Sequence, residues 1–457
     1  MKNLPLHQTS LVFILLFLVS LGSFAQTPEE KFFDWTSLQF PKEEYAARRS
    51  NLIDLMGQSE GGIFITTSRD GFSDGETFRQ LNDFLYFTGL ELSNSILCID
   101  ANNGEVTLFA PDRDLRFESP SRKNDFPGRP LGLDPSISTV SGIDQIRTID
   151  EFEGKFKEWI SNNRKISINA GRDDISQLET EFIYSWNENQ QLIHHIQTNY
   201  QSAKISNAFE SIARLRMIHS KAEIAVIRKA ALITSEGIVK SAKTIEAGVT
   251  ERDLEAELEA EFKRQGSQRL AFGSIIKSGP NSLWPWRILA SHYDRRNRVM
   301  EDGDLVIFDV GCEYNYYSSD VGRTFPVSGK FSPEQRRILK MEVSVSDAII
   351  AAIKPGVTFA DLRKVAFAAI PDEEEQFMQV GLFHGHHIGL SVSDPSISDA
   401  PLQPGMIFTV EPWYYNHENG ISVFTEDEVL VTADGVEVLT KNLPRSPEEL
   451  EEIVAKY

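Results

Sequence analysis

The sequence has few cysteines, a deficit of basic residues, and no long apolar run beyond its first 25 residues. Cys98 and Cys312 are its only cysteines, which excludes a fold held by a disulfide framework. Its 46 lysines and arginines face 67 aspartates and glutamates, giving a net charge of −21. Nucleic acids and anionic membranes repel such a chain, which excludes them as partners. Hydrophobic residues still make up 41% of the 457 residues, enough for ordinary packed cores.

The first 25 residues have the pattern of an export signal. Lys2 precedes the apolar run 11–19, and small residues lead to Ala25, after which cleavage is expected. The run is too short to cross ~30 Å of hydrocarbon, which disfavours a retained anchor and stable membrane insertion. We therefore expect an exported protein, periplasmic or secreted. Export would allow Cys98 and Cys312 to pair, although buried free thiols are the expected state.

After this signal (1–25), the distribution of helical and strand-like segments predicts two domains, 26–205 and 206–457. In the first, helical and strand-like segments alternate, with strands expected at 61–67, 84–88 and 95–100, so an α/β domain is predicted. From 206 to 265 the sequence is almost entirely compatible with helix, and Thr250 and Asp253 form a capping box. Strand-like segments and further helices follow.

Two acidic residues interrupt apolar, strand-like segments in the second domain. Asp309 lies in the segment 304–311, and Asp320 lies in 316–325. A tight turn at Tyr314-Asn315 would place the two aspartates directly opposite each other, with Cβ atoms ~4.5–5.5 Å apart. Facing carboxylates among apolar residues repel each other unless a cation lies between them.

The same pattern recurs downstream. Glu411 and Glu426 lie in the strand-like segments 406–412 and 420–431, and Asn419-Gly420 is a hairpin turn signal. Between the two acidic pairs lies the histidine-rich segment 384–390, in a chain with nine histidines. Two divalent cations would neutralise four carboxylates, and two-metal hydrolases hold their cations ~3.5–4 Å apart. Oxygen ligands with one imidazole favour Mn²⁺, with Co²⁺, Zn²⁺ or Fe²⁺ as alternatives.

Each motif alone has an ordinary explanation. A single aspartate in a strand is most often a surface residue or a turn former, and a histidine-rich loop is commonly a solvated loop. The combination of both pairs with the histidines, in this order, favours a metal site over these alternatives.

At these residues the sequence resembles the pita-bread metallopeptidases, which include methionine aminopeptidase, prolidase and aminopeptidase P. The resemblance implies that Asp309 holds one metal, that His386 and Glu411 hold the other, and that Asp320 and Glu426 bridge the two. The segment 78–90 resembles the signature of the aminopeptidase P N-terminal domain. The implied fold class is α+β, a pita-bread (creatinase/aminopeptidase-like) catalytic domain preceded by an α/β creatinase-type N-terminal domain.

The resemblance also implies an activity, the removal of the N-terminal residue from peptides with proline in second position. A metal-bridging hydroxide would attack the scissile carbonyl, with Glu411 as the candidate proton shuttle. His292 resembles the family histidine that supports the substrate, and a partly buried structural histidine is the alternative interpretation. Members of the family are commonly dimers or larger, so a homo-oligomer is implied.

The sequence departs from the family pattern at two aligned positions. Ser393 stands where a second histidine is usual, and His384 or His387 could replace it in space. Phe424 stands where the family has an arginine, which argues against a strict dipeptidase because that arginine resembles a clamp for the substrate carboxylate. An insertion containing 284–286 could line the substrate pocket or pack in the core. A prolidase-like dipeptidase, a peptidase of drifted specificity and a non-catalytic peptide-binding protein remain alternatives.

Overall fold

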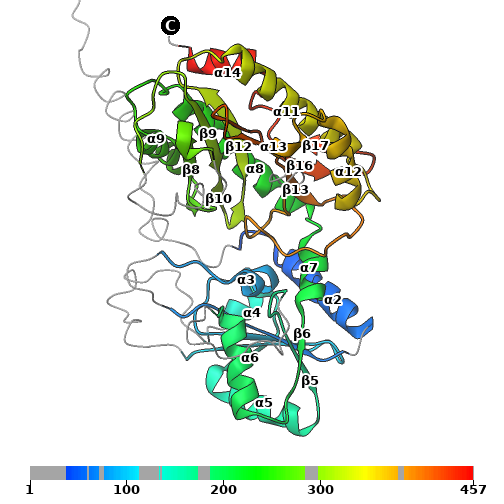
Figure 1. Cartoon of the computed structure of the whole chain (residues 1–457). Coiled ribbons are helices and arrows are strands. Elements are labelled where there is room, and N and C mark those ends of the chain that lie inside the picture. Colours follow the sequence, from blue (N-terminus) through cyan, green and yellow to red (C-terminus); the bar gives the residue numbers. More distant parts are fainter. Residues whose placement is uncertain are drawn as a thin grey trace, which may run out of the picture. The chain divides into compact units, whose positions relative to one another are not determined.

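We describe the protein from a computed structural model (Figure 1). The described residues are 38–58, 61–71, 77–112, 133, 136–172, 186–283, 297–378 and 385–455. The predicted export signal, His292, His384 and the insertion at 284–286 lie outside them. Within the described part, every helix is too short or too polar to span a bilayer.

The chain divides into two compact units, defined by which segments pack together. The first comprises Met1–Ile166 and Asn187–Ile205, and the second comprises Ser167–Trp186 and Ser206–Tyr457. Cys98 belongs to the first unit and Cys312 to the second, and both are buried free thiols, as expected.

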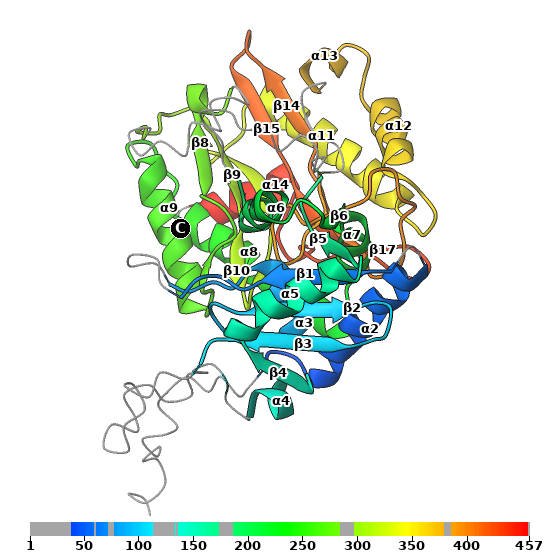
Figure 2. The ribbon, with the colours of Figure 1, turned by 90° about the horizontal axis from the view of Figure 1, so that it is seen from below.

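The first unit is built on a six-stranded sheet with the order β4-β3-β2-β1-β5-β6. Strands β1, β2 and β3, which lie side by side in Figure 2, are antiparallel, and β4 runs parallel to β3. The strands are β1 (Ile63–Thr67), β2 (Ile96–Asp100), β3 (Val106–Ala110), β4 (Gln145–Thr148), β5 (Lys165–Ile168) and β6 (Lys204–Asn207). The helices are α2 (Lys42–Gln58), α3 (Asn82–Thr88), α4 (Ser136–Ser141), α5 (Phe152–Ser161) and α6 (Glu188–Asn199).

The strand predicted at 84–88 was wrong, because these residues form helix α3. A short apolar run does not distinguish a strand from a buried helix, and α3 is buried on nearly all sides. Gly89 ends the helix with φ of 69°, and Arg48 and Arg49 of α2 donate to the carbonyls of Tyr86 and Phe87 (3.1 and 2.7 Å). This part of the aminopeptidase P-like segment therefore serves packing and the capping of α3.

The second unit contains three three-stranded sheets, β11-β10-β7, β12-β9-β8 and β13-β16-β17, and the hairpin β14-β15. Its strands are β7 (Arg269–Leu270), β8 (Ile275–Ser278), β9 (Leu305–Val310), β10 (Cys312–Tyr314), β11 (Tyr317–Ser318), β12 (Val321–Pro326), β13 (Ile407–Val410), β14 (Trp413–Asn416), β15 (Ile421–Phe424), β16 (Asp427–Val431) and β17 (Val436–Val438). Its helices are α7 (Phe209–Arg216), α8 (Lys221–Ala242), α9 (Glu251–Arg264), α11 (Pro333–Ala352), α12 (Phe359–Ala369), α13 (Glu375–Met378) and α14 (Pro447–Val454).

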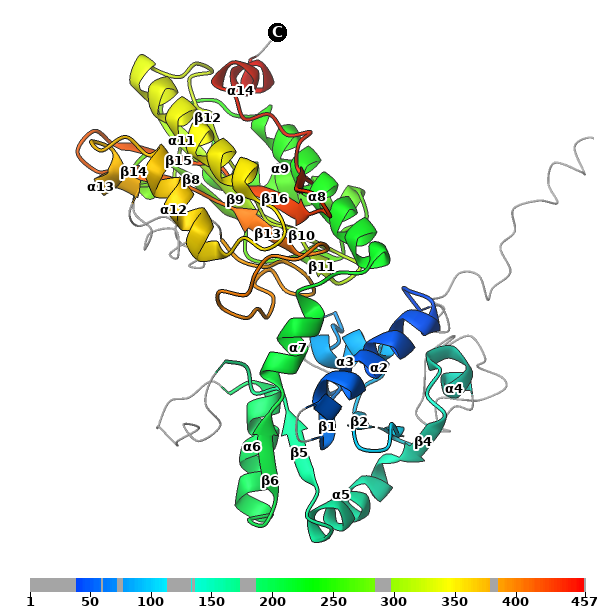
Figure 3. The same cartoon turned by 90° about the vertical axis from the view of Figure 1, so that its right-hand side faces the viewer.

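The order of elements repeats within the second unit. Helices α8 and α9 precede strands β8, β9 and β12, and helices α11 and α12 precede strands β13 to β16. Figure 3 shows the green helix pair and the yellow pair packed along the strands. All four helices begin with capping boxes, including the one predicted at Thr250 and Asp253. A core that includes Phe308, Phe325 and Phe408 joins helices to strands.

Candidate metal centre

The first acidic pair lies at the antiparallel strands β9 and β12, with Asp309 on β9 and Asp320 directly before β12. Asp309 lies opposite Gly322, so the predicted pairing of Asp309 with Asp320 was wrong. The turn residues are Asn315 and Tyr316, with φ of 47° and 69°. A two-residue hairpin turn of this kind needs positive φ at both positions, and it falls one residue later than predicted. Asp320 is therefore the diagonal neighbour of Asp309.

Gly322 connects this hairpin to the second acidic pair. Its N–H donates to the carbonyl of Glu426 (3.3 Å), and the Glu426 N–H donates back to the Gly322 carbonyl (3.0 Å). Asp309 and Glu426 therefore flank the same glycine from two sides. A Cβ atom on Gly322 would overlap the ring of Phe424 and lie 3.0 Å from Glu426 Cβ. The missing side chain makes room for Glu426.

In the second hairpin, the two glutamates face each other across a gap in the ladder. Val410 pairs with Asp427 and Trp413 pairs with Phe424. This common register places Glu411 opposite Glu426, whose backbone is bonded to Gly322 instead. The predicted turn at Asn419-Gly420 is part of the loop at 417–420 between β14 and β15.

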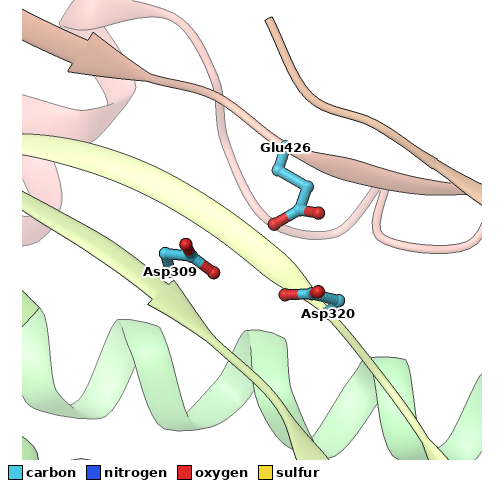
Figure 4. A group of neighbouring side chains, drawn as sticks. All are labelled: Asp309, Asp320 and Glu426. Atoms are coloured by element: carbon cyan, nitrogen blue, oxygen red, sulfur yellow. The ribbon is translucent and has the colours of Figure 1, made fainter. Parts of the chain in front are cut away.

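Three of the carboxylates converge. One oxygen each of Asp309, Asp320 and Glu426 lies within 4.8 Å of the others. Figure 4 shows the three side chains pointing toward one shared space, with Glu426 approaching from the opposite side to the two aspartates. Asp320 and Glu426 are only 5% and 1% exposed.

His386 and Glu411 adjoin this cluster. His386 Nε2 lies 3.4 Å from Asp320 Oδ2 and 3.9 Å from Glu411 Oε1. The segment 386–388 runs antiparallel to β13, where the His387 backbone bridges to Phe408. The structure therefore brings all five predicted ligands together, although their roles as ligands stay a prediction.

Of the two histidines considered as replacements for the missing one, His387 does not fill its place, and His384 lies outside the described residues. The His387 ring packs against Phe359 and Phe408, with ring centroids 5.4 and 6.0 Å apart, and burial lowers its pKa to about 3. Ser393 is exposed. A neutral imidazole held between two phenylalanines is part of the core.

Burial and mutual repulsion keep protons on the cluster. Burial, reinforced by the charge of Asp320, raises the pKa of Asp309 and Glu426 well above the usual range. Burial and Asp320 also raise the pKa of Glu411 to about 7, against the opposing effect of His386. The pKa of His386 is raised to about 9, because the Asp320 and Glu411 carboxylates outweigh the burial that lowers it.

The chemistry of these groups fits divalent cations. Asp320 Oδ1 and Glu426 Oε2 are buried and have no hydrogen-bond partner among the described residues. Buried carboxylate oxygens are normally paired or bound to metal, because an isolated buried charge is strongly unfavourable. The unsatisfied oxygens of Asp320 and Glu426 lie within a cluster of converging carboxylates, and such oxygens are suitable ligands for divalent cations.

Two buried residues that sequence reasoning missed hold the backbone of the cluster. Arg323 is 1% exposed and donates to the carbonyls of Gly322 and Glu426 (2.6 Å each) and to Asp427 Oδ1 (2.6 Å). Glu428 accepts the N–H of Asp320 at 2.7 Å. A charged residue in an apolar strand, such as Arg323 three residues after Asp320, is the signal that could have identified them.

Phe424, which stands where the family arginine was expected, packs among other aromatic side chains. The buried Phe424 lies against Trp413, with ring centroids 4.4 Å apart, and Trp413 stacks on Tyr415 at 4.9 Å. Trp413 and Tyr415 follow Glu411 along β14. We call Trp413, Tyr415 and Phe424 the aromatic stack.

Comparisons with known proteins agree with this architecture. Residues 225–433 match Metallopeptidase family M24, and residues 45–168 match Aminopeptidase P, N-terminal domain. An Escherichia coli protein named Xaa-Pro aminopeptidase is 27% identical over 455 residues, covering 91% of this chain and 98% of the relative. Intermediate cleaving peptidase 55, mitochondrial, of Arabidopsis thaliana is 28% identical over 443 residues, with coverages of 91% and 83%.

Solved structures show the same fold. A putative aminopeptidase P from Bacillus anthracis has a TM-score of 0.76 and 26% identity, covering 91% of this chain and 98% of the other. The structure of aminopeptidase P from Escherichia coli with the inhibitor Pro-Leu has a TM-score of 0.73, 25% identity and the same coverages.

The fold and the carboxylate cluster thus define a metallopeptidase with a pita-bread catalytic domain. The matches to its two parts are in the order expected from the sequence, and the predicted fold class is confirmed. The chain resembles aminopeptidase P over both of its parts, it is an enzyme, and its match to Metallopeptidase family M24 implies divalent metal ions.

Proposed function

We propose that the protein is a dinuclear-metal aminopeptidase that releases the N-terminal residue from peptides with proline in second position. The observation that carries this proposal is the convergence of Asp309, Asp320 and Glu426 within 4.8 Å, with unsatisfied buried oxygens. The preference for proline is inferred from relatives named Xaa-Pro aminopeptidase.

In this proposal Asp309 holds one cation, His386 and Glu411 hold the other, and Asp320 and Glu426 bridge them. Mn²⁺ is the proposed metal because four of the five ligands are carboxylates, with Co²⁺, Zn²⁺ or Fe²⁺ as alternatives. Paired divalent cations supply a hydroxide nucleophile near neutral pH by lowering the pKa of bound water.

The protein's own groups handle charge and protons. Glu411 is the candidate proton shuttle, which would take a proton and return it to the leaving amine. His292 is proposed to support the substrate.

The aromatic stack favours a peptidase over a prolidase-like dipeptidase. Phe424 cannot pair with a carboxylate as an arginine would. A dipeptide, whose carboxylate lies close to the scissile bond, should therefore bind less well than a longer peptide.

We also propose export after Ala25, to the periplasm or the medium, and a homo-oligomer of two or more chains. Sequencing the amino terminus of the mature protein and measuring its mass in solution by light scattering test these two points. An uncleaved amino terminus, or a monomer at micromolar concentration, would contradict them.

The central experiment uses purified protein, stripped with a chelator and then loaded with Mn²⁺. We expect rapid cleavage of Xaa-Pro-Yaa-Zaa, slower cleavage of Xaa-Pro, and little cleavage of Xaa-Ala-Yaa-Zaa. Asp320→Ala should lower kcat by roughly 10³-fold or more while the protein remains folded by circular dichroism.

Asp434→Ala is the matched control, since Asp434 is an exposed aspartate in a turn. It should leave kcat unchanged. Full activity in Asp320→Ala would show that Asp320 does not bridge the cations. Equal cleavage of the proline and alanine peptides would refute the proposed specificity.

A further inference from the structure

Thr409 lies between two of the proposed ligands. It is fully buried on β13, two residues before Glu411. The His386 N–H donates to Thr409 Oγ1 (3.2 Å), and Thr409 Oγ1 donates to Glu411 Oε1 (2.9 Å). Because a hydroxyl has one proton, its single donor bond goes to the carboxylate while its oxygen accepts the amide.

The backbone of Thr409 also contacts His386. The Thr409 N–H donates to the His386 carbonyl (3.0 Å), so both polar backbone groups of His386 are bonded to this one residue. The placement of the histidine segment on β13 therefore depends on Thr409.

Gly385 shows how closely these groups are packed. Its φ is +45°, and a Cβ atom at this position would overlap Thr409 Oγ1 and the Glu411 carboxylate. The chain thus passes directly over the hydrogen bond between Thr409 and Glu411, and only glycine leaves it undisturbed.

A free glutamate side chain samples several rotamers, and its carboxylate must be held in one of them to bind a cation well. The Thr409 hydroxyl engages one oxygen of Glu411 and leaves the other unrestricted by this bond. The same hydroxyl fixes the backbone of His386. Thr409 therefore couples two groups that come from separate segments of the chain.

We propose that Thr409 is a positioning residue of the metal centre, which sets the Glu411 carboxylate and the His386 backbone as one unit for the cation they share. Its effect on turnover rests on the proposed peptidase activity, and its effect on metal binding rests only on the ligand roles proposed for His386 and Glu411.

The test compares Thr409→Val, which removes the hydroxyl at constant shape, with Thr409→Ser, which restores it. Titration of chelated full-length protein with Mn²⁺ in a calorimeter should show one binding event weakened roughly 10–100-fold in Thr409→Val. In Thr409→Ser the Mn²⁺ affinity of this binding event should return to within about threefold of that of the unsubstituted protein. In Thr409→Val, kcat should fall more than KM rises.

Thr324→Val is the matched control. Thr324 is equally buried, and its hydroxyl donates to the Phe424 carbonyl (2.9 Å) and accepts the Phe424 N–H (2.8 Å) without touching a proposed ligand. We expect a comparable loss of thermal stability and unchanged Mn²⁺ affinity. Weakening of Mn²⁺ binding in Thr324→Val as large as in Thr409→Val would overturn the positioning role, because it would reflect general destabilisation.

Normal Mn²⁺ binding and normal kcat in Thr409→Val would also overturn the proposal. If that variant does not fold, Gly385→Ala provides the second test, since its methyl group would displace the Thr409–Glu411 pair, and unchanged Mn²⁺ affinity there would refute the role. A protein that binds two Mn²⁺ ions but cleaves no peptide would refute the proposed function alone.

Discussion

The two acidic hairpins of the second unit pair their carboxylates differently. In the first, Asp309 faces Gly322 within the ladder of β9 and β12, whereas Asp320 lies just before β12, where this ladder ends. In the second, the register places Glu411 opposite Glu426, at a point where the ladder is interrupted. The two aspartates are thus diagonal neighbours, one inside a ladder and one just beyond its end, whereas the two glutamates face each other across a gap.

Gly322 is the position where the two arrangements meet. It faces Asp309 within the first hairpin and exchanges two backbone hydrogen bonds with Glu426 of the second. The four carboxylates therefore gather where one strand position has no side chain and both hairpin ladders are interrupted.

The largest expected effect comes from filling the space at Gly322. In Gly322→Ala, the added methyl group overlaps the Phe424 ring and crowds Glu426, so the two hairpins should separate locally. We expect loss of bound metal by elemental analysis and a fall in kcat/KM of roughly 10³-fold, with an overpacking cost of about 1–3 kcal/mol.

Gly435→Ala is the control for Gly322→Ala, because a Cβ atom at Gly435 would meet nothing within 4 Å. It should bind metal and turn over normally. If Gly322→Ala behaves like Gly435→Ala, the shared glycine does not bring the hairpins together.

An intermediate effect is expected from pH. Glu411 has a pKa raised to about 7, so the stability that its protonated form gives the metal-free protein is lost as pH rises from ~4.5 to 7. His386 has a pKa raised to about 9, so its contribution is lost as pH rises from ~6.5 to 9. Chemical unfolding of chelated protein should show roughly 3–5 kcal/mol less stability at pH 8.5 than at pH 5.

The same protons oppose the metal, so Mn²⁺ affinity should increase with pH between 6 and 8. Glu411→Gln should remove the part of the stability change below pH 7 and reduce the part assigned to His386, because the Glu411 charge helps to raise the pKa of His386. Metal-free stability that rises with pH over this range would contradict the pKa directions.

The smallest effect should come from the aromatic stack at the end of the second hairpin. Trp413→Leu removes two ring contacts, and we expect a loss of about 1–2 kcal/mol in thermal unfolding. The fall in kcat/KM should be only a few-fold, because the backbone of Glu426 is held by Gly322 and Arg323.

Trp159→Leu tests the same substitution in the first unit, where Trp159 packs edge-on against Phe152. It should lower stability without changing kcat/KM. Loss of activity in Trp413→Leu as complete as in Asp320→Ala would show that the stack supports the glutamates directly.

The fold and the set of five residues were predicted from the resemblance to the pita-bread metallopeptidases, and the embedded carboxylates, the hairpin turn signal and the histidine segment that carry this resemblance are local patterns. The sequence did not predict the register of Asp309, which depends on Tyr316 adopting positive φ, an uncommon state for a bulky residue. Arg323 and Thr409 were missed because their importance comes from contacts with distant segments. The roles of His292 and Mn²⁺ stay predictions.

The bonds between Gly322 and Glu426 have a consequence for assembly. Neither hairpin alone holds the full set of carboxylates, so a peptide spanning 304–326 or 406–431 should have little affinity for a cation pair. A competent site arises only when both halves of the second unit have docked, which makes metal capture a late step in folding. Cation uptake would then report the completion of the tertiary structure.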